Sequence, residues 1–165
     1  MTLEPQAVAH VDEMFAVLND PAIYEYENEP PPSIEWLRKR FTKLESRRSP
    51  DGTEAWLNWV IRLPTGALTG FVQATVQADA CASIAYELSS AYWGRGLASR
   101  AVEAMIGELE SRYQVRELSA VFKRANLRSM RLLERLGFSL ASPEAHVERH
   151  VEPGELLMHR DLRKP

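Results

Sequence analysis

The fold is decided above all by one stretch of the sequence, Tyr86-Glu87-Leu88-Ser89-Ser90-Ala91-Tyr92-Trp93-Gly94-Arg95-Gly96-Leu97-Ala98. A strand pattern feeds a short glycine-bearing loop, and the loop opens a helix pattern. Such a loop leaves backbone N–H groups unpaired at the positive end of a helix dipole, where they can hold a phosphate. Gly94 and Gly96 would allow close approach of a ligand, Arg95 adds positive charge, and Ala98 leaves room for a bulky group. A plain strand-to-helix turn explains the glycines equally well, so this stretch alone leaves both interpretations open.

A second segment has the same strand-to-helix character. Asn126-Leu127-Arg128-Ser129 opens a helix pattern, and Leu136-Gly137-Phe138 closes it into a strand. Asn126 and Ser129 lie three positions apart and therefore share a helix face. Taken by itself, Asn126 is better explained as an N-cap, because Asn is among the preferred capping residues.

The remaining sequence alternates helical and strand-like patterns in an order typical of an α/β domain. Two helices come first, ending at Leu18 and Leu44, and two more are expected at 98–113 and 126–136. Strands are expected at 55–63, 68–76, 83–88 and 118–122, with two more after Phe138. The pattern predicts a single domain over residues 1–165, built on a mixed sheet.

Composition excludes several classes of function. The chain has 165 residues and a net charge of −3, which gives no electrostatic case for nucleic acid or anionic membranes. No apolar run is long enough to span a bilayer, and the start lacks the character of a signal peptide. Cys81 is the only cysteine and four histidines lack metal-like spacing, so we expect a cytoplasmic protein without disulfide or metal.

The two segments together resemble the GNAT superfamily of N-acetyltransferases. The signature of that family is Gln or Arg, two residues, Gly, one residue, then Gly or Ala. Here Trp93 stands at the first position, which is a departure, and the rest of the pattern is present. The phrase Tyr-Trp-Gly-Arg-Gly-Leu-Ala looks closest to the RimJ/RimL-like branch, which also typically carries the pattern seen here as Asn126, Ser129 and Leu136-Gly137-Phe138. The resemblance covers nearly the whole chain, including the early Asn19-Asp20-Pro21. The resemblance implies a mixed, mostly antiparallel sheet, splayed in the middle and flanked by about four helices, with a short first strand at residues 2–4.

The resemblance also implies transfer of an acetyl group from acetyl-CoA to a primary amine by direct attack, without a metal. It implies that the following residues bind the CoA pyrophosphate and pantetheine: Leu88, Trp93, Gly94, Arg95, Gly96, Leu97, Ala98, Ser99, Asn126 and Ser129. The acceptor we expect is a protein or peptide α-amine, because about one-tenth of such amines are neutral at pH 7 against about one lysine in 2,500. Small amines, polyamines and aminoglycosides remain alternatives, as do a CoA-binding module without turnover and a nucleotide-binding α/β domain. A homodimer is left open.

The catalytic groups are less well marked. Many GNAT enzymes place a tyrosine seven residues after the motif asparagine as the acid for the leaving thiolate, and here that position is Leu133. The resemblance assigns the role to Ser129 and assigns the base to Glu148 in a following strand. Residues 144–150 alternate like a strand and place His146 on the same face as Glu148, which makes His146 the second candidate base. Glu87, which neighbours Tyr86 on the opposite face of another strand, is the third.

The acceptor pocket is expected opposite the CoA arm, beneath the early loop. Acidic residues of that loop, Glu25, Glu27 and Glu29, would attract a cationic amine. The candidate substrate-binding residues are Tyr24, Tyr26, Trp36, Trp56, Asn58 and Tyr86.

Overall fold

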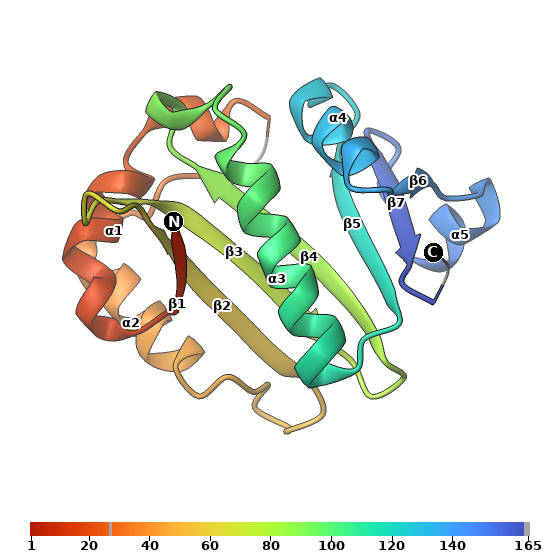
Figure 1. Ribbon diagram of the computed structural model, residues 1–165, viewed down its shortest axis with the longest axis horizontal. Helices are drawn as coiled ribbons and strands as arrows, with labels where there is room; N and C mark the ends of the chain where they lie inside the picture. The colour runs from red at the N-terminus through yellow and green to blue at the C-terminus, as the bar shows by residue number, and fades with distance from the viewer. Residues whose placement is uncertain (27, 164–165) are drawn as a thin grey trace.

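A mixed β-sheet runs through the protein, with helices on both of its faces (Figure 1). The computed structural model describes residues 1–26 and 28–163, and within them the strand order is β1-β2-β3-β4-β5-β7-β6. All neighbouring strands pair antiparallel except β4 and β5, which are parallel. The strands are β1 (Thr2–Pro5), β2 (Ala55–Arg62), β3 (Leu68–Val76), β4 (Cys81–Leu88), β5 (Glu117–Lys123), β6 (Ser139–Leu140) and β7 (Glu155–Asp161). The expected mixed, mostly antiparallel sheet is confirmed.

The helices divide between the two faces because side chains alternate along the strands. On β2, Trp59 and Ile61 pack on the α3 side, whereas Val60 between them packs against α1 and α2. In Figure 1, α3 crosses the near face of β2–β4 and α4 lies over the upper end of β5. The α-helices are α1 (Val11–Leu18), α2 (Ile34–Leu44), α3 (Leu97–Tyr113), α4 (Leu127–Arg135) and α5 (Pro143–Glu148).

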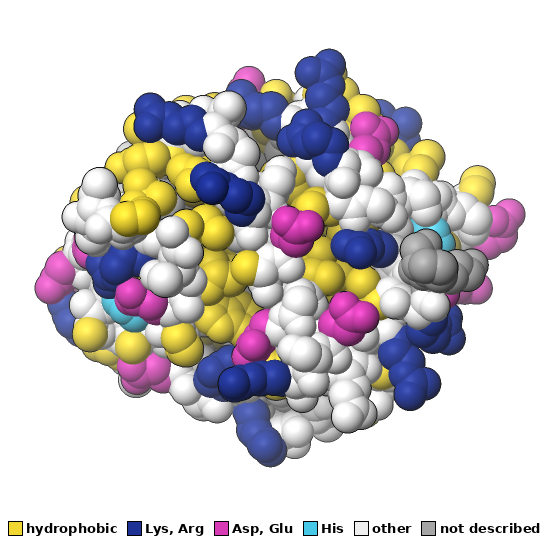
Figure 2. All heavy atoms as spheres, in the orientation of Figure 1, with side chains coloured by type: hydrophobic (Ala, Val, Ile, Leu, Met, Phe, Trp, Pro, Cys, Tyr) yellow, Lys and Arg dark blue, Asp and Glu magenta, His cyan; other side chains and the backbone are white. Residues whose placement is uncertain are grey.

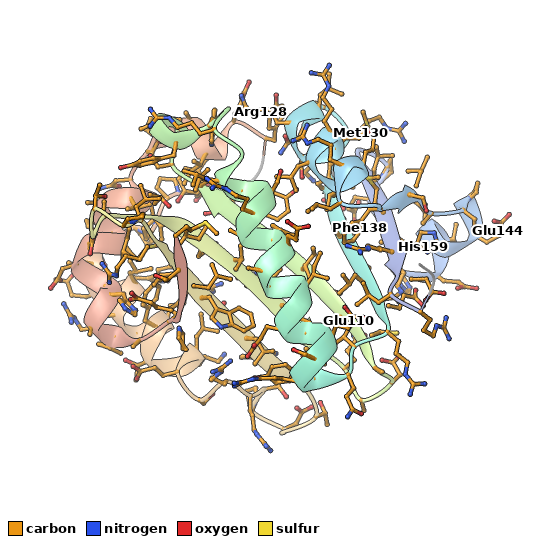
Figure 3. The ribbon with its side chains drawn as sticks, in the orientation of Figure 1. Glu110, Arg128, Met130, Phe138, Glu144 and His159 are labelled. Atoms are coloured by element: carbon orange, nitrogen blue, oxygen red, sulfur yellow. The ribbon has the colours of Figure 1, made fainter. Side chains whose placement is uncertain are left out.

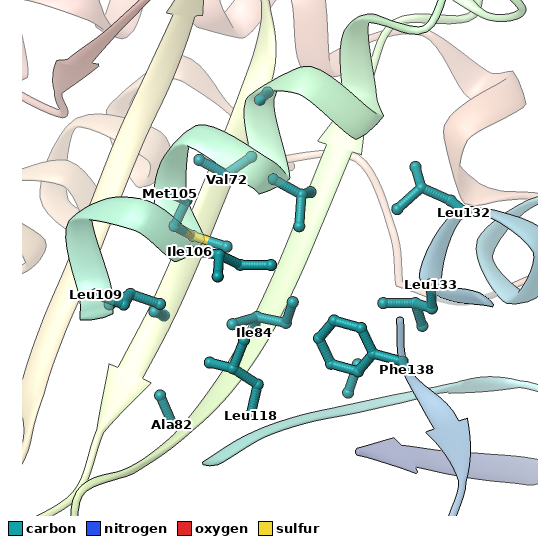
Figure 4. Close-up of a cluster of buried hydrophobic side chains, with 14 of the residues drawn as sticks. Val72, Ala82, Ile84, Met105, Ile106, Leu109, Leu118, Leu132, Leu133 and Phe138 are labelled. Carbon is teal, nitrogen blue, oxygen red and sulfur yellow. The ribbon is translucent and has the colours of Figure 1, made fainter. Parts of the chain in front are cut away.

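The larger hydrophobic core joins the two halves of the sheet (Figure 4). Leu133 of α4 and Phe138, which follows the helix, pack in one cluster with Ile84 of β4 and Leu118 of β5. Leu133 and Leu118 are both fully buried. Packing of this kind stabilises the fold by about 2–5 kcal/mol per large aliphatic side chain, judged by truncation to Ala.

The central strands separate where β4 leaves its parallel neighbour. The register between β4 and β5 covers only Cys81–Ser83 against Glu117–Ser119. Beyond Ser83, β4 remains paired with β3 on its other edge as far as Leu88. The sheet is therefore splayed in the middle, as expected, and the gap widens toward α4 in Figure 1.

One expected strand is wrong. Residues 144–150 do not extend the sheet, because Pro143–Glu148 forms the helix α5. The Ser142 hydroxyl caps this helix by accepting a hydrogen bond from the Ala145 amide, and Pro143 occupies the first turn, where proline is favoured. The cap outweighs the alternating pattern, so the two strands of the tail are β6 and β7 with α5 between them.

Candidate active site

The glycine loop ends in an open helix N-terminus. Gly94 (φ 75°) and Gly96 (φ 69°) both adopt the left-handed conformation, and Gly96 is the N-cap of α3. No side chain caps this helix, and its first turn carries no acidic residue. A Cβ atom added to either glycine would meet nothing within 4 Å, so the space beside the loop is open. The loop thus presents uncapped amides and the positive end of a helix dipole to a free volume, which fits an anionic phosphate.

A cavity of about 710 Å³ adjoins this loop and extends between α3 and α4; we call it the α3–α4 cavity. Among the residues expected to bind CoA, only Arg95 does not line it. Its guanidinium lies over the Tyr92 ring, 5.6 Å from the ring centre. The expected residues that do line it are Leu88, Trp93, Gly94, Gly96, Leu97, Ala98, Ser99, Asn126 and Ser129.

Three arginines of α4 line the same cavity and were not anticipated. Arg128, Arg131 and Arg135 recur at helical spacing, which places them on one face, and this spacing was the available signal. Figure 2 shows Lys and Arg side chains gathered along the upper rim of this face, above the point where the strands separate. Their charge complements the phosphates of a CoA-like ligand.

Arg128 connects three segments at the mouth of the cavity (Figure 3). Its guanidinium stacks over the Trp93 ring, 3.8 Å from the ring centre. It also donates a hydrogen bond of 2.9 Å to the carboxylate of Glu25 in the early loop. Trp93 itself donates from its indole nitrogen to the Leu88 carbonyl at 2.8 Å. Trp93 therefore ties the glycine loop to the end of β4 and stacks against Arg128. Trp93 is also the residue that departs from the family signature.

Asp20 fixes the early loop to the start of the glycine loop. Its carboxylate accepts hydrogen bonds from the Ser90 amide (2.7 Å), the Ser89 hydroxyl (3.3 Å) and the Ala22 amide (3.1 Å). The hydrogen bonding to Ser90 is the largest of the effects that hold the pKa of Asp20 below its usual value. The Asn19-Asp20-Pro21 signal thus has a structural explanation.

A tyrosine and a serine meet across the splay. The hydroxyls of Tyr86 on β4 and Ser129 on α4 are 2.7 Å apart. Burial raises the pKa of Tyr86 to about 12, so the phenol keeps its proton at neutral pH. Asn126 caps α4 by accepting from the Ser129 amide at 3.1 Å. Leu133, where many family members carry a tyrosine, is fully buried in the core.

A second cavity, of about 390 Å³, lies between α2 and the sheet; we call it the α2 pocket. Of the expected acceptor residues, Tyr24, Tyr26, Trp36, Asn58 and Tyr86 line it, and Trp56 does not. Of the acidic loop residues, Glu29 lines it, Glu25 pairs with Arg128 instead, and Glu27 lies outside the described residues.

The two cavities meet at the end of β4. Five residues line both of them: Ile23, Tyr26, Tyr86, Glu87 and Asn126. Glu87 and Tyr86 are neighbours on a strand and therefore leave its opposite faces. Glu87 and Tyr24 both line the α2 pocket, where burial and, to a lesser extent, the charge of Glu87 raise the pKa of Tyr24. We call the place where the two cavities share these lining residues the passage. With a carboxylate and a hydroxyl pair beside it, this arrangement is suited to transfer of a group between two ligands.

The structure does not bring Glu148 or His146 to this passage. Glu148 is exposed on α5 and lines neither cavity, and Figure 3 shows α5, marked by Glu144, at the outer edge of the molecule. His146 is engaged by the Leu157 amide at Nε2 (3.0 Å) and the Ser142 carbonyl at Nδ1 (2.9 Å). This pairing requires a neutral ring with its proton on Nδ1, so His146 joins α5 to β7.

Two further properties follow from the described part of the chain. Its His, Cys, Asp and Glu side chains form no group of three or more that could hold a metal ion. None of its helices combines the length and the apolar character that crossing a membrane requires.

Solved structures with the same fold include three acetyltransferases. A spermidine N-acetyltransferase SpeG chimera from Vibrio cholerae and hSSAT has a TM-score of 0.79 at 16% identity, covering 99% of this chain and 96% of that one. A ribosomal-protein-S5-alanine acetyltransferase from Vibrio fischeri has a TM-score of 0.79 at 15% identity, with coverages of 98% and 93%. Aminoglycoside acetyltransferase AAC(6')-Ib in complex with coenzyme A has a TM-score of 0.76 at 18% identity, with coverages of 98% and 95%. At these identities the likeness concerns the fold.

The family itself is shown by the sequence. No curated protein matches the chain. A family model described as "Acetyltransferase (GNAT) domain" matches residues 1–139, which include the early loop, the glycine loop and all of α4. The chain therefore belongs to the GNAT acetyltransferase family, and it is an acetyl-CoA-dependent N-acetyltransferase.

Proposed function

We propose that the α3–α4 cavity holds acetyl-CoA and the α2 pocket holds the acceptor amine, and that the acceptor is the α-amine of a protein or peptide. When bound, acetyl-CoA supplies an activated thioester. The uncapped amides of the glycine loop and the arginines of α4 bind its phosphates. The amides are neutral N–H donors at the positive end of a helix dipole, the arginines are cationic donors, and both face the same cavity. The observation that carries the proposal is the meeting of the two cavities beside Glu87, Tyr86 and Asn126.

In this proposal Glu87 replaces Glu148 as the base. From the acceptor face of the sheet, its carboxylate takes one proton from the ammonium, which leaves a neutral amine to attack the thioester carbonyl. The C–S bond breaks as the C–N bond forms, and the second proton of the nitrogen ends on the departing sulfur, so that CoA leaves as the free thiol while Glu87 returns its proton to solvent. A carboxylate is a weak base, and it deprotonates an α-amine of pKa about 8 more readily than a lysine of pKa about 10.4.

Ser129 and Tyr86 stabilise the leaving thiolate from the other side of β4. The paired hydroxyls can pass a hydrogen bond to the sulfur, because either atom of the pair can act as the donor. With a pKa of about 12, Tyr86 enters the reaction protonated. The pair takes over the role of the acidic tyrosine that many family members carry where this chain has Leu133.

The walls of the α2 pocket favour a peptide. Gln6, Asn58 and Gln73 supply amide groups along it, and amides pair with peptide N–H and C=O groups. Gln6 is 8% exposed, and its side-chain nitrogen is buried without a hydrogen-bond partner within the described residues. Such a donor favours an acceptor that brings a carbonyl oxygen. These features, with the sequence phrases noted above, support placing the chain in the RimJ/RimL-like branch.

The decisive test uses peptides that carry both a free N-terminus and an internal lysine. With acetyl-CoA present, we expect mass spectrometry to locate the acetyl group on the α-amine and free-thiol release to match it. Acetylation confined to lysine, or found only with polyamines or aminoglycosides, would reject the α-amine.

The cofactor site has a separate test. Gly96→Asp places a carboxylate beside the phosphates, and calorimetry should show loss of CoA binding. Gly66→Asp is the matched control, because Gly66 also has a positive φ (92°) and open surroundings but lies in the turn between β2 and β3. Equal CoA affinity in the two folded variants would show that the site is misplaced.

A further inference from the structure

The α2 pocket continues into a third hollow, which is lined by cations, whereas the passage is lined by the carboxylate of Glu87. This hollow, of about 230 Å³, lies between α2 and the strands β2 and β3; we call it the Trp56 hollow. It shares Arg40, Leu44, Asn58 and Gln73 with the α2 pocket, so the two form one groove. Trp56, expected in the acceptor site, lines this extension.

The charged side chains that line the extension, Arg40 and Lys43, are both cations. The nearby Glu54 carboxylate accepts a hydrogen bond from the Trp56 indole at 3.0 Å without lining the hollow. Arg40 and Lys43 stand three residues apart on α2 and therefore point to the same side of the helix. Their charged groups lie over aromatic rings, Arg40 over Trp36 at 5.7 Å and Lys43 over Trp56 at 5.3 Å. Neither forms an ion pair with a carboxylate in the described part of the chain. The two tryptophan rings hold both cations at the groove by cation–π contact, which leaves their charge in place.

The cationic end lies at a defined distance from the proposed base. Glu87 pairs with Phe71 across the β3–β4 ladder, and Trp56 pairs with Thr75 across the β2–β3 ladder. Phe71 and Thr75 are four residues apart on β3, which at about 3.3 Å per residue is about 13 Å. An extended peptide covers that length in about four residues.

We propose that the Trp56 hollow is a subsite for a carboxylate of the acceptor, positioned about three to five residues from the amine that is acetylated. This inference rests on the proposed function, whose acceptor it specifies further. An acceptor of this kind enters with its ammonium toward Glu87 and its carboxylate toward Arg40 and Lys43. The same cations repel the remote ammonium groups of a polyamine or aminoglycoside, so the subsite also selects against them.

The test compares peptides that differ only at the fourth residue, which is Glu, Gln or Lys, and that all have amidated C-termini. We expect the Glu peptide to exceed the Gln peptide by about 2- to 5-fold for each cation it meets, through KM rather than kcat, as for exposed ion pairs. The Lys peptide should be the poorest. The preference should shrink as salt is raised to 0.5 M, because exposed charges are screened. A tetrapeptide ending in Gln, tested with a free and an amidated C-terminus, shows whether a terminal carboxylate serves as well as a side chain.

Variants assign the effect to the hollow. In Arg40→Gln/Lys43→Gln, the KM values of the Glu and Gln peptides should become equal. Lys39→Gln, on the same helix and lining none of the three cavities, should keep the wild-type preference. Equal KM values for the Glu and Gln peptides in the wild type, or a preference that persists in the double variant, would overturn the subsite and leave the proposed function intact. Failure to acetylate any peptide N-terminus would overturn both.

Discussion

Substituting Gly70 tests whether close packing of β3 against β4 sets the geometry of the active site. A Cβ atom at this position would overlap the Glu87 carbonyl oxygen and lie 2.8 Å from Leu88 Cα. Both neighbours are backbone atoms, so no side chain can turn aside. Since carbon atoms pack at about 3.5–4.0 Å, β4 must move by about 1 Å.

That movement acts on the residues at the passage. Overpacking of this kind costs about 1–3 kcal/mol, which for a domain of this size lowers Tm by about 2–12 °C. Misplacing a reacting group by about 1 Å costs about 100-fold in rate. We therefore expect Gly70→Ala to lose about 100-fold in kcat/KM under conditions where the variant remains folded.

The matched control is Gly107→Ala, in the exposed face of α3, where a Cβ atom would meet nothing within 4 Å. Ala is a better helix former than Gly by about 1 kcal/mol, so Tm should rise by about 2–4 °C with activity unchanged. Thermal denaturation and thiol-release assays would be run on both variants. A Gly70→Ala protein with wild-type kcat/KM would refute the claim that the position of Glu87 limits the reaction.

Three further variants probe separate parts of the site. Glu87→Gln should lower kcat by about 100- to 10,000-fold and remove the acidic limb of the pH–rate profile, and an unchanged profile would exclude Glu87 as the base. Asp20→Asn should be less stable than wild type near neutral pH, and urea titrations should show this difference in stability vanish on acidification. Because folding lowers the pKa of Asp20, its carboxylate contributes fully to stability above about pH 4, and this contribution is lost as pH falls through the native pKa. Arg128→Met should weaken CoA binding by about 5- to 20-fold in calorimetry through loss of one cation at the phosphates, whereas equal affinity would confine Arg128 to holding Glu25.

Local chemistry made most of the fold predictable. The glycine loop, the Asn126 cap and the strands expected at 55–63 and 68–76 follow from patterns and from turn and cap preferences that act within a few residues. Prediction failed at residues 144–150, where an alternating pattern indicated a strand. There a Ser-Pro cap, equally local, decided for α5, so the error was to weigh periodicity above capping.

The site was less predictable because it is assembled from distant segments. The glycine loop could be identified from sequence, since one continuous segment supplies its amides. The contact of Tyr86 with Ser129 spans 43 residues, and the pairing of Arg128 with Glu25 spans 103. Nothing in the spacing of these residues indicates that they meet, because the splay of β4 from β5 decides it. The same splay lets Glu87 line both cavities, whereas the sequence alone made it only the third candidate for the base.

The packing of Leu133 and the contact between Tyr86 and Ser129 depend on the same helix, α4. Leu133 fills the cluster that joins α4 to β4 and β5. That packing fixes α4 beside the splay, which is what brings Ser129 to 2.7 Å from the Tyr86 hydroxyl. The phenol therefore belongs to a residue of β4 rather than of α4, and burial keeps it protonated. In the proposed mechanism, hydrogen-bond donation to the leaving group therefore depends on the packing of α4 against the sheet, and we expect a cavity made at Leu133 to lower the rate as well as the stability.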